Sequence, residues 1–494
     1  MTDRALPLLR ENPRLAGLAA FPFGFDIHRA AHGHVEEVRL ASGGPLDIVA
    51  GDDTGGTYFV CADGSVLYAD SEGSAGIIGS SVDEALEIMI GLAEAEEEDG
   101  DEEDEAQQGH GLEEARAELR AALGFPERSP TELEAMLRAA LLRTEPDFVL
   151  LNATEHNAYQ LLDSYPRPPL WEPVLASGRA DLALLRAGDR AVWDAVAGDP
   201  VRRRLALRAA QFDRADGDIE VLRHLLRHEA HSSMTDELRL AAVLVGLHGD
   251  IADLPLLHEV RETTYDTWCG LGGMPEPGAS AQELRAWAQE LDESLFGADP
   301  ADEPVGTWTD LARDQGMTEL ARIALIRRLD EIVMDHSRLR RPDAPRELTT
   351  TPLRTLAHDF EELGDRLQAL RAQRLLAALR EKAWDRVLAR LDQARLERAV
   401  GQLSQSVRTL AYLRETLAAP EDDSLRHWRC ASLGRFMAKE HYRLTRSLAE
   451  AGRPDEARAL LTAADAILGE LPENAAKGVR ELAEEATARV REVS

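Results

Sequence analysis

The sequence predicts a mainly helical protein with a small N-terminal α+β domain and a helical-repeat (α-solenoid) C-terminal part. Ala, Leu, Arg and Glu dominate the 494 residues and aromatic residues make up only 5%, a composition that favours helices over strands. Short apolar runs between Gly- and Asp-rich turns are confined to about the first ninety residues. Beyond them, apolar residues recur with the 3.6-residue period of a helix.

The length predicts several domains, because a single core rarely serves more than roughly 250–300 residues. We expect an α+β domain over 1–93, an acidic linker over 94–110, a helical domain over 111–300 and a second helical domain over 301–494. The linker prediction rests on the run EAEEEDGDEEDE, whose like charges repel and which has no large apolar group to bury. Such a linker can be a solvated hinge, or a tether that competes for a basic groove.

Three apolar runs predict strands in the N-terminal domain: LDIVA (46–50), TYFVCA (57–62) and SVLYA (65–69). DDTGG and ADG between them tolerate the backbone of tight hairpins, which indicates an antiparallel meander. Ser81 and Glu84 have capping-box spacing and predict the start of a helix. Its apolar face, which can cover the sheet, comprises Val82, Ala85, Leu86, Met89 and Ile90.

Two related helical hairpins are predicted at 203–226 and 236–260, with GDI turns at Gly217 and Gly249. A weaker relative begins at Ser177. This spacing resembles HEAT repeats and implies a short α-solenoid in which each helix pair covers the next. Two further capping boxes predict helix starts on either side of these hairpins, at Thr131 with Glu134 and at Ser280 with Glu283.

Apolar residues alternate by four and three in two later segments, which predicts long helices that pack side by side. The pattern fits an intramolecular seam or a dimer interface. The two sets are Leu356, Phe360, Leu363, Leu367 and Leu370, and Leu396, Val400, Leu403, Val407 and Leu410. One hairpin near the end resembles a single tetratricopeptide repeat, on the residues Leu444, Leu448, Gly452, Ala457, Leu461 and Ala464.

Acidic residues outnumber basic ones by 90 to 56, a formal charge of -34. This excess disfavours nucleic acids and anionic membranes as partners and favours a protein with a basic surface, although it can also serve solubility alone. The cysteines Cys61, Cys269 and Cys430 lie far apart and indicate neither a disulfide framework nor a zinc knuckle. The start has no apolar core of a signal peptide, so we expect a cytoplasmic protein.

The segments Gly51–Tyr58, Asp63–Tyr68 and Ser80–Leu86 carry a resemblance to a known family. Together with the residues between them, they resemble the later half of a SUKH superfamily domain, over about fifty residues. The resemblance implies an α+β fold and a role as a bacterial immunity protein that neutralises a toxin, or as a regulatory protein that acts by contact. Neither role needs catalysis.

We therefore expect a non-enzymatic protein-binding protein. The alternatives are a helical-repeat scaffold or adaptor and an unrecognised hydrolase in the Gly-rich domain. The candidate partner-binding residues cluster at the hairpins. An alternative role for the acidic ones is to stabilise their own turns without contacting a partner. They are Asp52, Asp53, Tyr58, Asp63, Tyr68, Asp70 and Glu72.

We expect no catalytic residue, cofactor or metal, although two groups of histidines have metal-like spacing. His224, His228 and His231 share one helical face, but leucines lie opposite, which predicts that the histidines face solvent, and no acidic or Cys cluster accompanies them. A second cluster comprises His28, His32 and His34, in which His34 and Glu36 have the H-x-E spacing of zinc deaminases without the P-C-x-x-C partner. We interpret it as a loop with satisfied hydrogen bonds.

Overall fold

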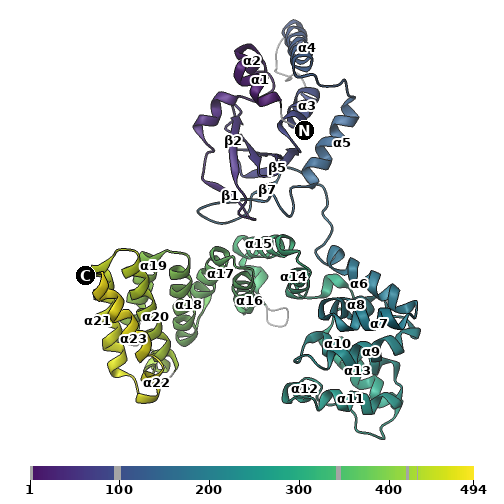
Figure 1. The fold of residues 1–494 in the computed structure, drawn as a ribbon, viewed down its shortest axis with the longest axis vertical. Coiled ribbons are helices and arrows are strands. Elements are labelled where there is room, and N and C mark those ends of the chain that lie inside the picture. Colours follow the sequence, from purple (N-terminus) through teal and green to yellow (C-terminus); the bar gives the residue numbers. More distant parts are fainter. Residues whose placement is uncertain (1–3, 94–101, 341–345, 419–421, 431, 494) are drawn as a thin grey trace. The chain divides into compact units, whose positions relative to one another are not determined.

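The computed structural model describes residues 4–93, 102–340, 346–418, 422–430 and 432–493. The chain divides into two compact units, whose helices and strands are labelled in Figure 1. The first unit comprises Met1–Leu150 and Tyr159–Ala324, and the second comprises Leu151–Ala158 and Leu325–Ser494. The structure confirms a mainly helical protein with a small N-terminal α+β part. Within the described ranges, no helix combines the length and the apolar character needed to cross a membrane.

The N-terminal sheet has the strand order β2-β3-β4-β5-β7. These strands are β2 (Leu46–Gly51), β3 (Thr57–Cys61), β4 (Val66–Ala69), β5 (Ser74–Gly79) and β7 (Gln160–Leu161). The three predicted runs form β2, β3 and β4 of an antiparallel meander. Strand β5, which the runs did not predict, continues the meander, and β7 adds to β5 in parallel. A two-stranded sheet pairs β1 (Val38–Leu40) with β6 (Leu150–Asn152).

The N-terminal fold extends past residue 93, where the sequence predicts its end. Its helices are α1 (Ala5–Glu11), α2 (Pro13–Ala20), η1 (Ile27–His32), α3 (Val82–Leu92), α4 (Glu102–Leu123) and α5 (Pro130–Leu142). Leu112 and Leu119 of α4 belong to the same core as Phe25 and Leu86, and α5 packs on β5. Helix α4 thus begins inside the predicted acidic linker of 94–110, whereas residues 94–101 lie outside the described part of the chain.

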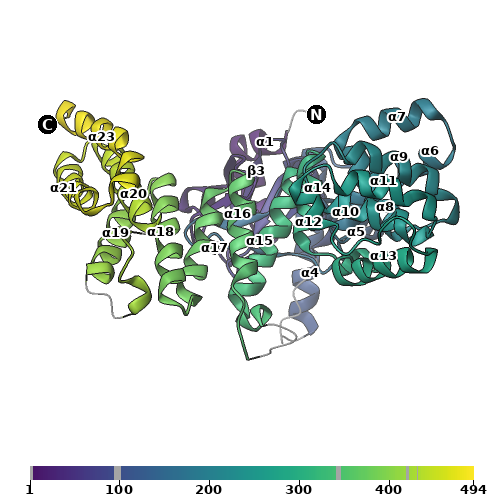
Figure 2. The same ribbon diagram turned by 90° about the horizontal axis from the view of Figure 1, so that it is seen from below.

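The rest of the first unit consists of packed helices, seen side by side in Figure 2. They are α6 (Trp171–Arg186), α7 (Arg190–Gly198), α8 (Pro200–Phe212), η2 (Asp216–Asp218), α9 (Ile219–Glu229), α10 (Asp236–His248), η3 (Ile251–Asp253), α11 (Leu254–Arg261), α12 (Tyr265–Gly270), α13 (Ala281–Leu295), η4 (Pro300–Asp302) and α14 (Val305–Asp314). The two segments predicted to be related have the same local structure, since α8-η2-α9 and α10-η3-α11 each join two helices through a 3-10 turn.

The second unit is a helical-repeat-like series of antiparallel hairpins. It begins within α15 (Thr318–Met334), which spans the boundary between the two units. It continues with η5 (His336–Leu339), α16 (Thr351–Glu362), α17 (Arg366–Leu379), α18 (Ala383–Ala399), α19 (Leu403–Ala418), η6 (Asp423–Leu425), α20 (Ser432–Glu450), α21 (Pro454–Glu470), α22 (Glu473–Lys477) and α23 (Arg480–Glu492). Residues Leu151–Ala158 also belong to this unit. They are held there because Gln368 Nε2 donates to the His156 carbonyl (2.6 Å) and Asp330 accepts from the Ala158 N–H (3.0 Å).

The prediction of long helices that pack side by side is correct in the packing and wrong in the helix lengths. The first alternating set is split between α16 and α17 and the second between α18 and α19. Gly364 and Gly401 have φ of +74° and +80°, the left-handed backbone with which glycine commonly ends a helix. Each set therefore lines a helical hairpin.

The hairpin that resembles a tetratricopeptide repeat consists of α20 and α21, which pack on each other. Ala457 and Ala464 are buried between helices of this unit, as expected of small residues at a close contact. Gly452 instead lies in the turn with φ of +70°.

Candidate functional site

The sheet topology separates the predicted partner-binding residues into two groups. The turns β2–β3 and β4–β5 lie at one end of the antiparallel sheet, and the turn β3–β4 lies at the other. Asp52, Asp53, Asp70 and Glu72 therefore share one end, while Asp63 lies at the opposite end, where it forms an ion pair with Arg143 (3.2 Å). The seven residues do not form a single surface.

Asp52 is buried and is not the exposed carboxylate that the sequence suggests. One carboxylate oxygen accepts from the Thr54 N–H (2.9 Å), the Thr54 hydroxyl (2.8 Å) and the Gly56 N–H (2.7 Å). The other accepts from the Tyr68 hydroxyl (2.7 Å). Burial alone would raise the pKa of Asp52, but these hydrogen bonds together lower it. Asp52 thus stabilises its own turn.

Tyr58 is also buried, which corrects its assignment as a contact residue. It lies opposite Tyr68 across β3 and β4, with ring centroids 4.8 Å apart, and 5.0 Å from the Phe25 ring. Aromatic side chains in such tilted arrangements stabilise a core. Tyr58 therefore supports the sheet and is not available to a partner.

Asp53 and Glu72 remain exposed at the same end of the sheet. The Ser71 hydroxyl donates to the Thr54 carbonyl (3.1 Å) and joins the two turns that carry them. Asp70 holds the second turn, because it accepts from the N–H groups of Glu72 and Ser74 (2.9 and 2.8 Å). Two rigid turns thus present Asp53 and Glu72 to solvent.

The His34–Glu36 pair belongs to a closed hydrogen-bond network. His34 Nδ1 contacts the Thr57 hydroxyl (2.9 Å) and Nε2 contacts the Tyr159 hydroxyl (3.1 Å), which donates to Glu36. Burial lowers the pKa of His34, opposed by the charges of Glu36 and Asp70. Because Thr57 is only 2% exposed, its hydroxyl is not a reachable nucleophile. The 3-10 helix η1 carries the other two histidines of that cluster, His28 and His32.

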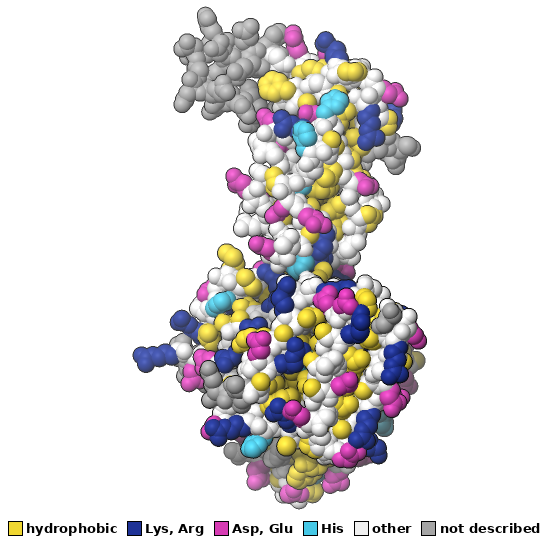
Figure 3. All heavy atoms as spheres, turned by 90° about the vertical axis from the view of Figure 1, so that its left-hand side faces the viewer, with side chains coloured by type: hydrophobic (Ala, Val, Ile, Leu, Met, Phe, Trp, Pro, Cys, Tyr) yellow, Lys and Arg dark blue, Asp and Glu magenta, His cyan; other side chains and the backbone are white. Residues whose placement is uncertain are grey.

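Charge is divided unequally between the two units. The first unit has 61 Asp and Glu residues against 26 Lys and Arg, whereas the second has 29 against 30. On the face of the C-terminal helices turned to the viewer in Figure 3, Lys and Arg are interspersed with Asp and Glu. The acidic excess that the whole sequence shows is therefore a property of the first unit.

The histidine stripe of α9 is only partly exposed, which corrects the prediction of a solvent face. The His224 side chain is 18% exposed and its ring packs on Trp193 of α7, with centroids 5.6 Å apart. His228 is half-buried, and its ring centroid lies 4.8 Å from that of His224. His231 is exposed and follows the end of α9.

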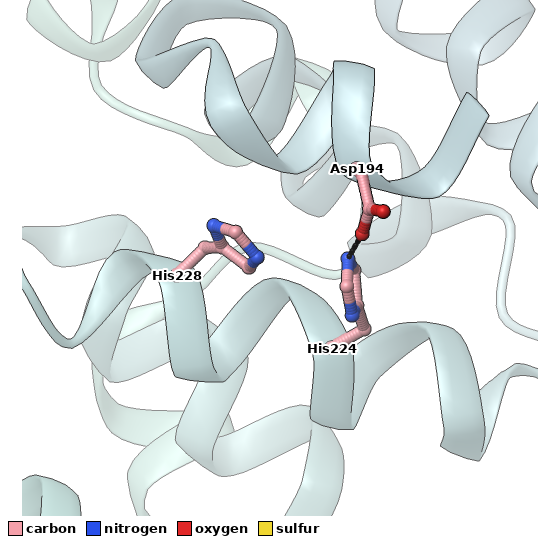
Figure 4. A group of neighbouring side chains, drawn as sticks. All are labelled: Asp194, His224 and His228. Atoms are coloured by element: carbon pink, nitrogen blue, oxygen red, sulfur yellow. Dashed lines mark ion pairs between the residues drawn. The ribbon is translucent and has the colours of Figure 1, made fainter. Parts of the chain in front are cut away.

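A carboxylate accompanies these histidines, contrary to the prediction. Asp194 of α7 lies next to His224, with its Oδ1 3.4 Å from the ring Nε2 (Figure 4). One ligand atom from each of Asp194, His224 and His228 can be chosen so that all three lie within 4.8 Å of one another. Burial lowers the pKa of His224, as does the charge of His228, while Asp194 raises it. Two imidazoles and a carboxylate are a donor set for a divalent transition metal.

An exposed aromatic pair on α12 is a second feature that sequence reasoning missed. Tyr265 and Trp268 are 77% and 51% exposed, with nearly parallel rings whose centroids lie 6.4 Å apart. The Arg261 guanidinium lies 5.6 Å from the Trp268 ring centroid. Tyr, Trp and Arg are the residue types most often found at the energetic centres of protein interfaces. The i, i+3 spacing of Tyr265 and Trp268 is the sequence signal that could have indicated this pair.

The chain matches no family model, no curated protein and no solved structure.

Proposed function

We propose that this chain is a non-enzymatic binding protein whose partner is a protein with a basic surface, bound by the first unit. The observation that carries the proposal is the division of charge, since the first unit has more than twice as many acidic as basic residues and the second has nearly equal numbers. A strongly acidic unit attracts cationic proteins over a distance and repels nucleic acids and anionic membranes.

The N-terminal fold supports a SUKH-like immunity or regulatory protein as the particular form. The antiparallel strands β2 to β5 are followed by α3, which begins after Ser81, and these elements carry the resemblance. Many toxin domains that cut nucleic acid are basic, and an acidic surface can cover the cleft of such a domain. We therefore propose a bacterial, cytoplasmic immunity protein. Its free cysteines, Cys61, Cys269 and Cys430, fit a reducing compartment.

Asp53 and Glu72 are the contact residues best placed for this role. Both are exposed, and the Ser71–Thr54 hydrogen bond holds their turns together. A rigid surface loses little conformational entropy on binding. Charges at the rim of an interface act mainly on the association rate. Their effect can therefore be measured separately from that of packing contacts, which act mainly on the dissociation rate.

The test is capture of the partner from the source cell with the full chain, followed by binding kinetics at two salt concentrations. Reversing both charges, with Asp53→Lys and Glu72→Lys, should lower the association rate by roughly threefold to tenfold at low salt. The matched control, Glu481→Lys with Glu484→Lys, changes the charge equally at two exposed positions of α23 in the second unit. An acidic partner, or equal effects of both pairs, would contradict the proposal.

A helical-repeat adaptor is the second candidate function, favoured by the exposed pair Tyr265 and Trp268 beside Arg261. In that case the partner should contact α12, and Trp268→Ala should raise the dissociation rate. Truncating an aromatic side chain at an interface centre typically costs at least about 2 kcal/mol, roughly a thirtyfold loss of affinity. A loss with Trp268→Ala but none with the Asp53 and Glu72 reversals would favour the adaptor over the immunity protein.

A further inference from the structure

His224 and His228 are brought to one place by α9 itself. Residues four apart on a helix are neighbours on its surface, and the two ring centroids lie 4.8 Å apart. Helix α7 packs against α9 and adds Asp194 from a second element. The cluster therefore does not depend on a mobile loop.

The distance between His224 and Asp194 is compatible with two ligands of one metal ion. A tetrahedral zinc with bonds of roughly 2.0–2.2 Å places its nitrogen and oxygen ligands about 3.4 Å apart. His224 Nε2 lies 3.4 Å from Asp194 Oδ1. Among the described residues this nitrogen has no hydrogen-bond partner, although it is buried. A buried polar atom without a hydrogen bond needs an explanation, and a bound ion is one that also accounts for the neighbouring carboxylate.

The surroundings hold the His224 ring in place. Its ring packs on Trp193, and the Trp193 indole N–H donates to the Leu185 carbonyl (2.8 Å). This packing limits the rotation of the His224 ring. Asp194, in contrast, is 74% exposed, which leaves the site open to solvent on its side.

We propose that Asp194, His224 and His228 bind one divalent transition-metal ion of the zinc class, with water at the remaining position. The ion would link α7 to α9, and an ion that binds only the folded state stabilises it. This site is independent of the proposed binding function, because none of its residues belongs to the proposed contact surfaces.

The test is titration of the full chain, without an affinity tag, with Zn²⁺ by calorimetry and with Co²⁺ by its visible absorption. The wild type should bind one equivalent tightly. The variants His228→Gln and Asp194→Asn should each bind at least roughly a hundredfold more weakly, since loss of an outer-shell contact alone costs 10- to 100-fold. The control is His231→Gln, on the exposed histidine beyond the end of α9. It should bind as the wild type does.

Weak binding of the metal ion to other carboxylates on the surface should be the same in all of these variants. It therefore does not affect the difference in affinity between them. Zn²⁺ should raise the melting temperature of the wild type and His231→Gln, and not that of His228→Gln. Asp194→Asn changes an exposed side chain, so it keeps the test valid if His228→Gln fails to fold. The absence of a tight equivalent in the wild type, or equal affinity in Asp194→Asn and His231→Gln, would overturn the proposal.

Discussion

The two units use arginine differently. In the first unit, four arginines of α8 point to acidic groups on neighbouring elements: Arg202 to Asp181, Arg203 and Arg204 to Glu229, and Arg208 to Glu237 and Glu303. Arg203 and Arg208 are themselves buried. In the second unit, pairs such as Arg395–Glu361 and Arg446–Glu485 are half-exposed. The carboxylates of Glu397 and Glu440 are buried there, but the arginines that pair with them remain partly exposed.

This difference explains how one unit can be strongly acidic outside and still pack its helices. Two of its arginines, Arg203 and Arg208, are buried, and each meets a carboxylate at close range. The surface is then left with the surplus of acid. The second unit balances opposite charges along its surface, as Figure 3 shows for one face, and has no such surplus to attract a partner.

The largest expected effect comes from breaking the buried ion cluster of the first unit. Glu229 is fully buried and accepts from Arg203 (2.5 Å), Arg204 (3.1 Å) and the Thr235 hydroxyl (3.0 Å). Glu229→Gln removes the charge and leaves Arg203 buried without a counter-ion. The free energy of unfolding should fall by about 3–5 kcal/mol, measured by urea unfolding or hydrogen exchange of α8 and α9.

The matched control is Glu220→Gln on the same helix. Glu220 pairs with Arg223, but its own side chain is 59% exposed and Arg223 keeps Asp253 as a second partner. An exposed pair of this kind contributes about 0–1 kcal/mol. If both variants lowered stability equally, the buried cluster would not distinguish the first unit.

The second unit has a buried histidine, His441, where the first has the buried arginines Arg203 and Arg208. His441 of α20 contacts the Met437 carbonyl through Nδ1 (2.7 Å), and its Nε2 contacts Arg414 (3.1 Å). This arrangement fits a neutral ring with the proton on Nδ1. Burial lowers the pKa of His441 to about 4, and the positive charge of Arg414 adds to this.

A histidine whose pKa is lower in the folded than in the unfolded state makes the free energy of unfolding fall as the pH is lowered. The contribution is fully present above the unfolded pKa of about 6.5 and is lost as pH falls toward 4. Between pH 7 and pH 5 the second unit should lose about 2 kcal/mol. His441→Gln should lack this component, as followed by hydrogen exchange of α20. An equal pH dependence in both proteins would contradict the assignment.

Local signals in the sequence predict the start of a helix well where neighbouring capping residues determine it. Ser280 and Glu283 form the predicted capping box of α13. The box predicted at Thr131 and Glu134 is wrong by two residues, because Ser129 and Glu132 form it and Pro130 occupies the first helical position. Proline fits that position, so the cap falls on the residue before it.

Long-range packing decides what the sequence could not predict. The shared face of His224 and His228 follows from their spacing, but the burial of that face depends on Trp193 of α7. Asp194 is thirty residues away in the chain from His224, so no spacing rule links them. Similarly, the acidic run predicts a linker where α4 begins, because the packing of Leu119 of α4 into the N-terminal core is a long-range contact.

The smallest expected effect is a difference in salt response between the units. The first unit has a surplus of acidic residues that repel one another, and the second has nearly equal numbers of both signs. Salt screens both kinds of interaction, with a Debye length that falls from roughly 30 Å at 0.01 M to roughly 8 Å at 0.15 M. Added NaCl should therefore stabilise the first unit and leave the second unchanged or slightly less stable, because pairs such as Arg446–Glu485 weaken.

Each shift should stay below about 1 kcal/mol, because the charges concerned are exposed. Hydrogen exchange can follow both units in one sample, with α10 reporting the first unit and α20 the second. Sucrose, which stabilises folded proteins without screening charge, serves as the control and should move both helices in the same direction. If NaCl also changed the stability of α10 and α20 in the same direction, the unequal division of charge would not affect the stability of the two units differently. The electrostatic basis of the proposed partner binding would then lose its support.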